Sequence, residues 1–131
     1  MPAKVLIVED DKLTALGIAE VVTLAGYDVI GSVSSVSEAV DRASVVYPDV
    51  AVFDIRLRGR RDGVEGAAIL KEMGGAEVVF VSAEQDGDTL ERERAVQPVA
   101  LLLKPCHPRD LLCAVQNAAG PKRPLPICGW I

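Results

Sequence analysis

The chain has 131 residues, and its 19 acidic against 14 basic side chains give a formal net charge of −5. A chain of this length fits one domain, which can bury enough surface to fold without a disulfide or a structural metal. Half of the residues are hydrophobic but only 4% are aromatic, so the core must consist of Val, Leu, Ile and Ala. This composition excludes a disordered chain, and the acidic balance argues against a broad nucleic-acid-binding surface.

The cysteines, the single histidine and the N-terminal sequence exclude further classes of protein. The three cysteines form no Cys-x-x-Cys pair, and a single histidine leaves no set of four zinc ligands. An odd number of cysteines without a signal peptide indicates reduced thiols. The apolar run at 5–8 is too short for a membrane span and ends in three acids. We therefore expect a cytoplasmic protein that binds neither membrane nor nucleic acid.

Short apolar runs alternate with longer amphipathic segments along the chain. The apolar runs predict strands at 5–8, 29–30, 50–53, 78–81 and 101–103. The amphipathic segments predict helices at 13–25, 36–46, 64–73, 89–96 and 109–119. Gly26 and Gly120 are suited to end the helices that precede them, and Pro108 is suited to the first turn of the last helix.

Spacing within the helical segments predicts which side chains face the core. In the first helix the expected apolar stripe consists of Leu13, Leu16, Ile18, Val21, Val22 and Leu24. On the last helix we expect Cys113 to be part of the core. In the helix at 89–96, the pairs Asp88–Arg92 and Glu91–Arg94 are spaced for ion pairs along the surface.

The alternation of strands and helices predicts an α/β fold with a parallel sheet and helices on both faces, because strands that are apolar throughout are buried on both sides. Right-handed crossovers and five strands favour a doubly wound, flavodoxin-like sheet in the order 2-1-3-4-5. We expect one domain over residues 1–120. The segment 121–131 contains three prolines, is expected to be extended, and is too short for an output domain.

Ligands of an open α/β sheet bind beyond the carboxyl ends of the strands, where the strand order reverses. The residues that follow four of the predicted strands are polar: Glu9, Asp10 and Asp11 after the first, Asp54 after the third, Ser82 after the fourth, and Lys104 after the fifth. Strands one and three are neighbours in the predicted order, so their acids converge. Asp11 alone is best explained as a helix cap.

Several carboxylates at one edge stay ionised together only with a cation nearby. Oxygen ligands without sulfur or imidazole favour Mg²⁺ or Mn²⁺, which also bind phosphate oxygens. A carboxylate beside such a metal is a nucleophile that can form an acyl phosphate. Lys104 supplies a positive charge for phosphoryl oxygens, Ser82 supplies a hydroxyl donor, and the small Ala83 leaves room for a phosphate.

Five segments together resemble the receiver domain of two-component response regulators over about residues 3–119. They are Val-Leu-Ile-Val-Glu-Asp-Asp at 5–11, Val-Phe-Asp-Ile-Arg-Leu at 52–57, Asp-Gly-Val-Glu at 62–65, Val-Phe-Val-Ser-Ala at 79–83, and Leu-Leu-Lys-Pro at 102–105. This resemblance implies the same strand order as the one reached above and a stand-alone receiver similar to the chemotaxis regulators.

The resemblance also implies a role for each matching residue. Asp54 is the expected phosphoacceptor, and Glu9 and Asp10 are the expected acid pair that holds Mg²⁺, together with Asp54 and the backbone carbonyl of Arg56. Ser82 is the expected switch hydroxyl. Lys104 is expected to contact a phosphoryl oxygen, with a cis peptide bond to Pro105.

Three features near these residues depart from the family pattern or add to it. Leu101 stands at the switch position where the family often has Tyr or Phe, so an aromatic switch is missing. Arg56 and Glu84 are expected to border the route of attacking water, and we hypothesise that they pair over the phosphoryl group. The arginines between positions 56 and 61 suggest either a solvated loop or a docking contact for an acidic kinase surface.

The resemblance implies a protein that accepts a phosphoryl group from a histidine kinase or a histidine phosphotransfer protein. It would signal to an unknown downstream protein through the face of helix four, strand five and helix five, or through a second copy of itself. It would catalyse only its own phosphoryl transfer and dephosphorylation. Two alternatives are open: a degenerate receiver that binds partners without phosphorylation, and, less well matched, a phosphatase with an aspartyl nucleophile.

Overall fold

A computed structural model describes residues 2–83 and 87–120 of the chain. Five parallel strands form one sheet in the order β2-β1-β3-β4-β5, as the sequence predicts. The strands are β1 (Lys4–Val8), β2 (Asp28–Val33), β3 (Val50–Phe53), β4 (Glu77–Ser82) and β5 (Ala100–Leu103). The helices are α1 (Lys12–Leu24), α2 (Val36–Val45), α3 (Gly63–Gly74), α4 (Gly87–Ala95) and α5 (Pro108–Ala119).

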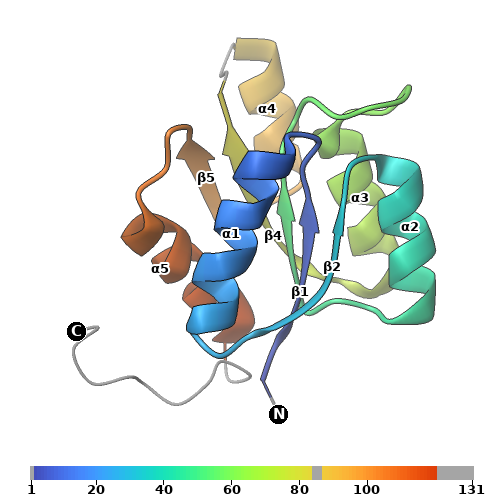
Figure 1. Cartoon of the computed structure of the whole chain (residues 1–131). Coiled ribbons are helices and arrows are strands. Elements are labelled where there is room, and N and C mark those ends of the chain that lie inside the picture. The colour runs from blue at the N-terminus through green and yellow to red at the C-terminus, as the bar shows by residue number, and fades with distance from the viewer. Residues whose placement is uncertain (1, 84–86, 121–131) are drawn as a thin grey trace.

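The helices cover both faces of the sheet, so the core has two parts (Figure 1). Side chains of α1 and α5 pack with Val5, Ile7 and Val52 on one face. Side chains of α2 and α3 pack with Leu6, Val8 and other strand residues on the opposite face. Alternate residues of β1 thus point to opposite clusters, which is why its sequence is apolar throughout.

The buried face of α1 differs from the predicted stripe. The residues that it buries are Ala15, Ile18 and Val22, whose spacing of three and four positions places them on one side of a helix. The stripe was wrong for Leu13, Leu16 and Leu24, which are 78%, 61% and 78% exposed. The prediction failed because it counted large apolar residues and left out the small Ala15.

Two further predictions on side chains are corrected by the structure. Cys113 is exposed, because Leu111, Leu112, Ala114 and Val115 take the buried positions around it on α5. The ion pair that the structure shows for Arg92 joins α4 to Asp62, the N-cap of α3, at 2.8 Å between Nη2 and Oδ2. Arg92 therefore links two helices.

The two edge strands are less buried than the three central ones. Residues of β2 and β5 are mostly half-buried, and Leu103 of β5 is 53% exposed, whereas β1, β3 and β4 are almost wholly buried. On α4 the one buried residue is Glu93, so this helix buries no apolar side chain of its own. The central strands are thus the rigid part of the sheet, and their carboxyl ends position the polar residues.

Candidate functional site

The carboxyl ends of β1 and β3 lie side by side at the point where the strand order reverses. Two backbone hydrogen bonds extend the sheet past these ends: the N–H of Glu9 donates to the carbonyl of Val33, and the N–H of Asp54 donates to the carbonyl of Val8, both at 2.9 Å. The backbone of Glu9 and Asp54 is therefore fixed by the sheet. This places acids that are 45 positions apart in the sequence next to each other.

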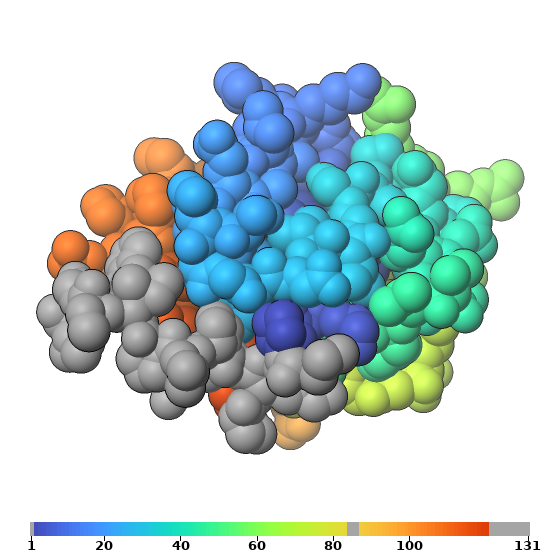
Figure 2. Space-filling view, turned by 60° about the horizontal axis from the view of Figure 1, so that its bottom comes forward, coloured from blue at the N-terminus to red at the C-terminus, as the bar shows by residue number. Residues whose placement is uncertain are grey.

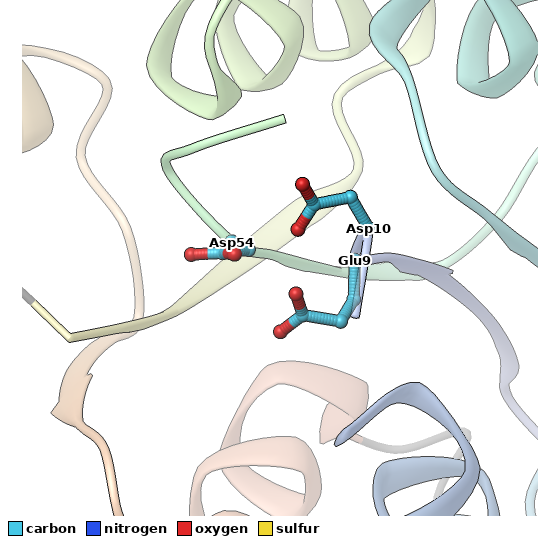
Figure 3. A group of neighbouring side chains, drawn as sticks. All are labelled: Glu9, Asp10 and Asp54. Atoms are coloured by element: carbon cyan, nitrogen blue, oxygen red, sulfur yellow. The ribbon is translucent and has the colours of Figure 1, made fainter. Parts of the chain in front are cut away.

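Three of these acids face a common point. One carboxylate oxygen each from Glu9, Asp10 and Asp54 lies within 4.8 Å of the other two (Figure 3). Glu9 is 4% exposed, Asp54 is 8% exposed, and Asp10 is half-buried, so the cluster opens to solvent on one side. Hard oxygen donors in a half-open cluster fit Mg²⁺, which binds few carboxylates and keeps several waters.

Asp11 has a different role from its two acidic neighbours, as the sequence predicts. Its side chain caps α1 by accepting a hydrogen bond from the N–H of Thr14 at 3.0 Å, and it also accepts one from the Thr14 hydroxyl. These hydrogen bonds lower the pKa of the Asp11 carboxyl. Asp11 is exposed and lies outside the acid cluster.

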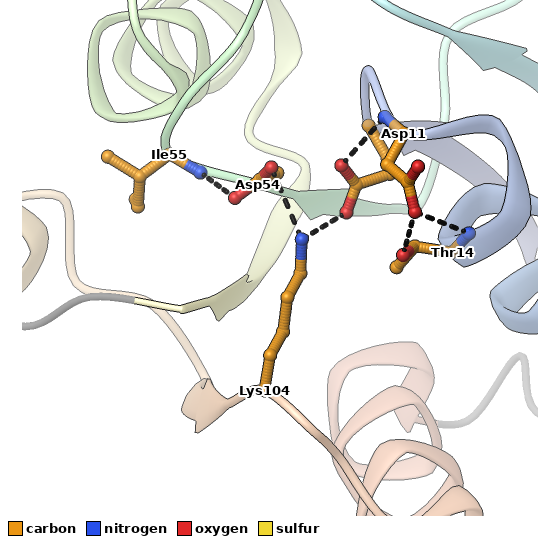
Figure 4. A network of polar contacts seen from close by, with 6 residues as sticks. Asp11, Thr14, Asp54, Ile55 and Lys104 are labelled. Carbon is orange, nitrogen blue, oxygen red and sulfur yellow. Dashed lines mark hydrogen bonds and ion pairs between the residues drawn. The ribbon is translucent and has the colours of Figure 1, made fainter.

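Lys104 connects the acid cluster to β5 (Figure 4). Its Nζ lies 2.6 Å from Oε1 of Glu9 and 3.3 Å from Oδ2 of Asp54. Its backbone N–H donates to the carbonyl of Ser82 at 2.9 Å, so the end of β4 positions the lysine. The peptide bond from Lys104 to Pro105 is cis, as expected. The second oxygen of Asp54 accepts a hydrogen bond from the N–H of Ile55 at 2.7 Å.

The acids and the lysine change one another's pKa values. Burial, opposed by the hydrogen bond from Lys104 and aided by the nearby Asp54, raises the pKa of Glu9 to about 7. Burial by itself would lower the pKa of Lys104, but the hydrogen bond to Glu9 and the charges of Asp54 and Glu9 outweigh it and raise the pKa. Above pH 7, Lys104 is therefore an ammonium paired with two carboxylates.

An open hollow of about 290 Å³ lies beside the acid cluster. Five predicted site residues line it together, namely Asp54, Arg56, Ser82, Ala83 and Lys104. Glu9 and Asp10 line an adjoining hollow of about 300 Å³. The first hollow is large enough for a phosphoryl group and the end of the group that donates it.

Three residues of this region were not predicted as site residues, although two of them belong to the motif quoted at 62–65. Asp62 and Thr89 also line the 290 Å³ hollow. Gly63 packs against the backbone of the loop that begins at Asp54: a Cβ at this position would lie 1.8 Å from the carbonyl oxygen of Asp54. The Gly63 N–H donates to the carbonyl of Ile55 at 2.7 Å. The Asp-Gly pair at the start of a helix was the signal that could have pointed to this close approach.

Two predicted residues lie elsewhere or outside the described part of the chain. Leu101 is half-buried in β5 beside Phe80 and packs on the cluster under α2 and α3, so it is a neighbour of the site and not one of its lining residues. Glu84 falls within residues 84–86, which the structure does not describe, and its hypothesised pairing with Arg56 stays a prediction.

The geometry and the sequence agree with a known family. Residues 5–116 match the response regulator receiver domain. The chain belongs to this family. Receiver domains are signalling domains of two-component systems. They generally bind Mg²⁺ at an acidic pocket and interact with a histidine kinase or a phosphotransfer partner. In this receiver, Glu9, Asp10 and Asp54 form such a pocket.

Two relatives of this receiver are regulatory proteins by name. It is 33% identical to the transcriptional regulatory protein PdtaR of Mycobacterium tuberculosis, with 90% of this chain and 57% of that protein covered. It is 36% identical to the positive alginate biosynthesis regulatory protein of Pseudomonas aeruginosa, with 91% and 48% covered. The chain thus spans about half the length of these relatives.

Solved receiver structures have the same fold. The signal receiver domain of a modulated diguanylate cyclase from Desulfovibrio desulfuricans G20 superposes with a TM-score of 0.85 at 36% identity, covering 90% of this chain and 94% of that one. In the part of the receiver that the structure describes, no helix is both long and apolar enough to span a membrane.

Proposed function

We propose that this receiver accepts a phosphoryl group on Asp54 from a phosphohistidine of a histidine kinase or a histidine phosphotransfer protein, in a Mg²⁺-dependent step. The observation that carries the proposal is the position of the Asp54 carboxylate. It shares the Lys104 ammonium with Glu9, lies close to Glu9 and Asp10, and stands at the edge of an open hollow. This ion pair faces a space that can admit a phosphate.

The transfer begins when a carboxylate oxygen of Asp54 attacks the phosphorus of the phosphohistidine. A bond between phosphorus and the Asp54 oxygen forms, and the bond between phosphorus and the imidazole nitrogen breaks. The electron pair of that bond stays on the nitrogen of the donor, which then takes up a proton. The product is an aspartyl phosphate, and water regenerates the carboxylate by attacking the phosphorus and releasing inorganic phosphate.

Glu9, Asp10, Asp54 and the backbone carbonyl of Arg56 would hold the metal. When bound, Mg²⁺ neutralises the acid cluster and stabilises the charge on the phosphoryl oxygens. The donor set fits this ion because all side-chain ligands are carboxylates and one side of the cluster is open. Mn²⁺, which also prefers oxygen ligands, would serve in its place.

The remaining residues of the hollow contact the phosphoryl group or control the access of water to it. Lys104 contacts one phosphoryl oxygen by exchanging part of its present contact with Asp54 for the new charge. Ser82 offers a hydroxyl, and Ala83 leaves the entrance open. Arg56 lies beside the acceptor and, with Glu84, would restrict the water that hydrolyses the aspartyl phosphate. A receiver of this kind catalyses its own phosphorylation and dephosphorylation and turns over no other substrate.

We infer that the signal leaves through α4, β5 and α5. The carbonyl of Ser82 binds the backbone N–H of Lys104, so a movement of Ser82 toward a phosphoryl group acts directly on the end of β5. Leu101 lies on the same strand in a half-buried position and can change its packing, although it offers no hydroxyl. Phosphorylation would shift a population between two arrangements of this face, which would bind a downstream protein or a second copy.

Mapping the modified residue tests this proposal, because Asp10, Asp54 and Asp62 all lie close enough to compete as acceptors. The receiver is incubated with acetyl phosphate and Mg²⁺, the acyl phosphate is reduced with borohydride to fix its position, and the peptides are sequenced by mass spectrometry. We expect modification at Asp54. Modification at Asp10 or Asp62 in the wild type would refute the assignment of the acceptor.

A further inference from the structure

The loop between β3 and α3 concentrates positive charge in an acidic chain. Four of its six residues from 56 to 61 are arginines, although the whole chain has a net charge of −5. Their side chains, those of Arg56, Arg58, Arg60 and Arg61, are exposed. In the described part of the chain, neither Arg60 nor Arg61 takes part in an ion pair. The charge of these two arginines is therefore available to a partner.

The loop is held in place at one end. The backbone N–H of Arg58 donates to the carbonyl of Ser34 at 3.3 Å, and Arg58 forms an isolated β-bridge with Ser35, the N-cap of α2. Gly59 follows with a φ of +92°, a conformation that favours glycine and turns the chain away from this anchor. In Figures 1 and 2 the green loop projects from the body of the molecule beside α2.

An open hollow of about 400 Å³ lies between this loop and the start of α2. Its lining includes three arginines, two serines of α2 or its cap, and one acid of α2, namely Arg58, Arg60, Arg61, Ser35, Ser37 and Asp41. The first turn of a helix adds partial positive charge from its free N–H groups. A carboxylate side chain of a partner would meet three arginines here against the single acid Asp41, with a helix N-terminus beside them.

This arginine surface is continuous with the phosphorylation site. Arg58 lines both the 400 Å³ hollow and the hollow that contains Glu9 and Asp10. The loop begins two residues after Asp54, at the same edge of the sheet. A protein that brings a phosphohistidine to Asp54 must therefore cover this edge and come within reach of Arg58, Arg60 and Arg61.

The negative charges around Asp54 repel an approaching phosphoryl group, and the positive charges of this surface would oppose that repulsion. A phosphoryl group carries a charge of about −1.5 to −2 and must approach three carboxylates. Oppositely charged groups outside the contact zone speed the encounter of two proteins and select the partner. Arginines beside the acids would attract a negatively charged donor surface without occupying the site.

We propose that Arg58, Arg60 and Arg61, with the first turn of α2, form a docking surface for an acidic segment of the protein that donates the phosphoryl group. This inference rests on the proposed function and names the chemistry of the partner. A nucleic acid could meet the same arginines, but the patch is small and the chain is acidic overall, which favours a protein partner.

The test compares a protein that donates the phosphoryl group with a small-molecule donor. The double variant Arg60→Glu/Arg61→Glu is incubated with acetyl phosphate and, separately, with an autophosphorylated histidine kinase. The kinase used is the one, among the histidine kinases encoded in the same genome, that transfers its phosphoryl group fastest to the wild type. Arg60→Lys/Arg61→Lys keeps the charge. Arg42→Glu/Lys71→Glu makes the same change of charge in the last turns of α2 and α3, at positions that line none of the three hollows described above. Each rate is measured across a series of salt concentrations.

We expect the charge reversal to slow transfer from the kinase about tenfold at low salt and to flatten its salt dependence, while labelling by acetyl phosphate changes less than about twofold. The lysine variant and the control on α2 and α3 should keep the wild-type kinase rate. An unchanged kinase rate at all salt concentrations would overturn the docking surface. The same holds if the charge reversal weakens binding of RNA but leaves transfer from the kinase unaffected. If acetyl phosphate labels the wild type but no kinase transfers to it, the docking surface is overturned too. If neither acetyl phosphate nor any kinase labels the wild type, the proposed function is refuted instead.

Discussion

Replacement of Lys104 by methionine removes the cation from two buried acids and should destabilise the receiver in a pH-dependent manner. The ammonium lies 2.6 Å from Glu9 and 3.3 Å from Asp54. A hydrogen bond to a charged group contributes about 1.5–3 kcal/mol, and breaking a fully buried pair costs about 3–5 kcal/mol. Lys104 is 22% exposed, and Glu9 can take up a proton, so we expect a loss of about 2–3 kcal/mol near pH 7.5 without metal.

The pH dependence follows from the pKa of Glu9. In the wild type this pKa is raised from 4.5 to about 7, so the folded state binds more protons than the unfolded state between these values. Stability therefore falls as the pH rises through this window. Without Lys104 the pKa of Glu9 rises further, and the penalty extends to higher pH. Near pH 5.5, where Glu9 is protonated in both proteins, the difference should shrink to about 1 kcal/mol.

Urea denaturation at both pH values, with and without saturating Mg²⁺, measures this effect. Mg²⁺ should reduce the loss, because it supplies the missing positive charge. Lys12→Met is a matched control, since Lys12 is an exposed lysine close to the acids, and we expect a change below about 0.5 kcal/mol. An equal loss for Lys104→Met at both pH values and at both metal concentrations would refute the account of these charges.

Three further predictions concern the surroundings of the site. Gly63→Ala should destabilise the receiver by about 2–4 kcal/mol in urea denaturation and abolish phosphorylation, because its Cβ would lie 1.8 Å from the carbonyl oxygen of Asp54. Arg92→Ala should cost less than about 1 kcal/mol, because its ion pair is half-exposed, whereas Asp62→Ala should cost about 1–2 kcal/mol by also removing the capping box of α3. Mg²⁺ affinity, measured by titration calorimetry, should fall about tenfold per pH unit below 7, where Glu9 must lose its proton to bind.

Each of these predictions has an outcome that would contradict it. Gly17→Ala is the control for Gly63→Ala, because a Cβ on Gly17 meets nothing within 4 Å, and it should stabilise α1 by about 0.5–1 kcal/mol. A Gly63→Ala variant of wild-type stability would show that the backbone at Asp54 can move away from residue 63 at little cost in free energy. Equal losses of stability for Arg92→Ala and Asp62→Ala would show that the capping box of α3 contributes nothing. A Mg²⁺ affinity that does not change with pH would show that Glu9 loses no proton when the metal binds.

Much of this fold could be predicted from the sequence, because the runs at 5–8, 50–53 and 78–81 are wholly apolar and lie between amphipathic segments. Only a parallel sheet with helices on both faces buries such strands. The face of α1 could not be predicted as well. Three large leucines there are exposed, and a small alanine completes the buried face, so side-chain size was a poor guide to burial on this helix.

The candidate site was predictable where it depends on strand ends and less so elsewhere. Glu9, Asp54 and Lys104 follow strands directly and Ser82 is the last residue of β4, so sheet topology alone brings them together. Thr89 reaches the hollow from a helix, and its position depends on how α4 packs, which no periodic pattern specifies. Asp62, likewise, could be recognised as a cap from the sequence, but its place beside the acceptor depends on the path of the arginine loop.

The central claim is that Asp54 accepts a phosphoryl group in a step that requires a divalent cation. Intact mass spectrometry after incubation with acetyl phosphate, with and without Mg²⁺, tests it most directly on the wild type and on Asp54→Ala. We predict a gain of one phosphoryl group that requires Mg²⁺ and is absent from the variant. No gain in the wild type from acetyl phosphate or from any phosphohistidine donor, or an equal gain in Asp54→Ala, would contradict the account.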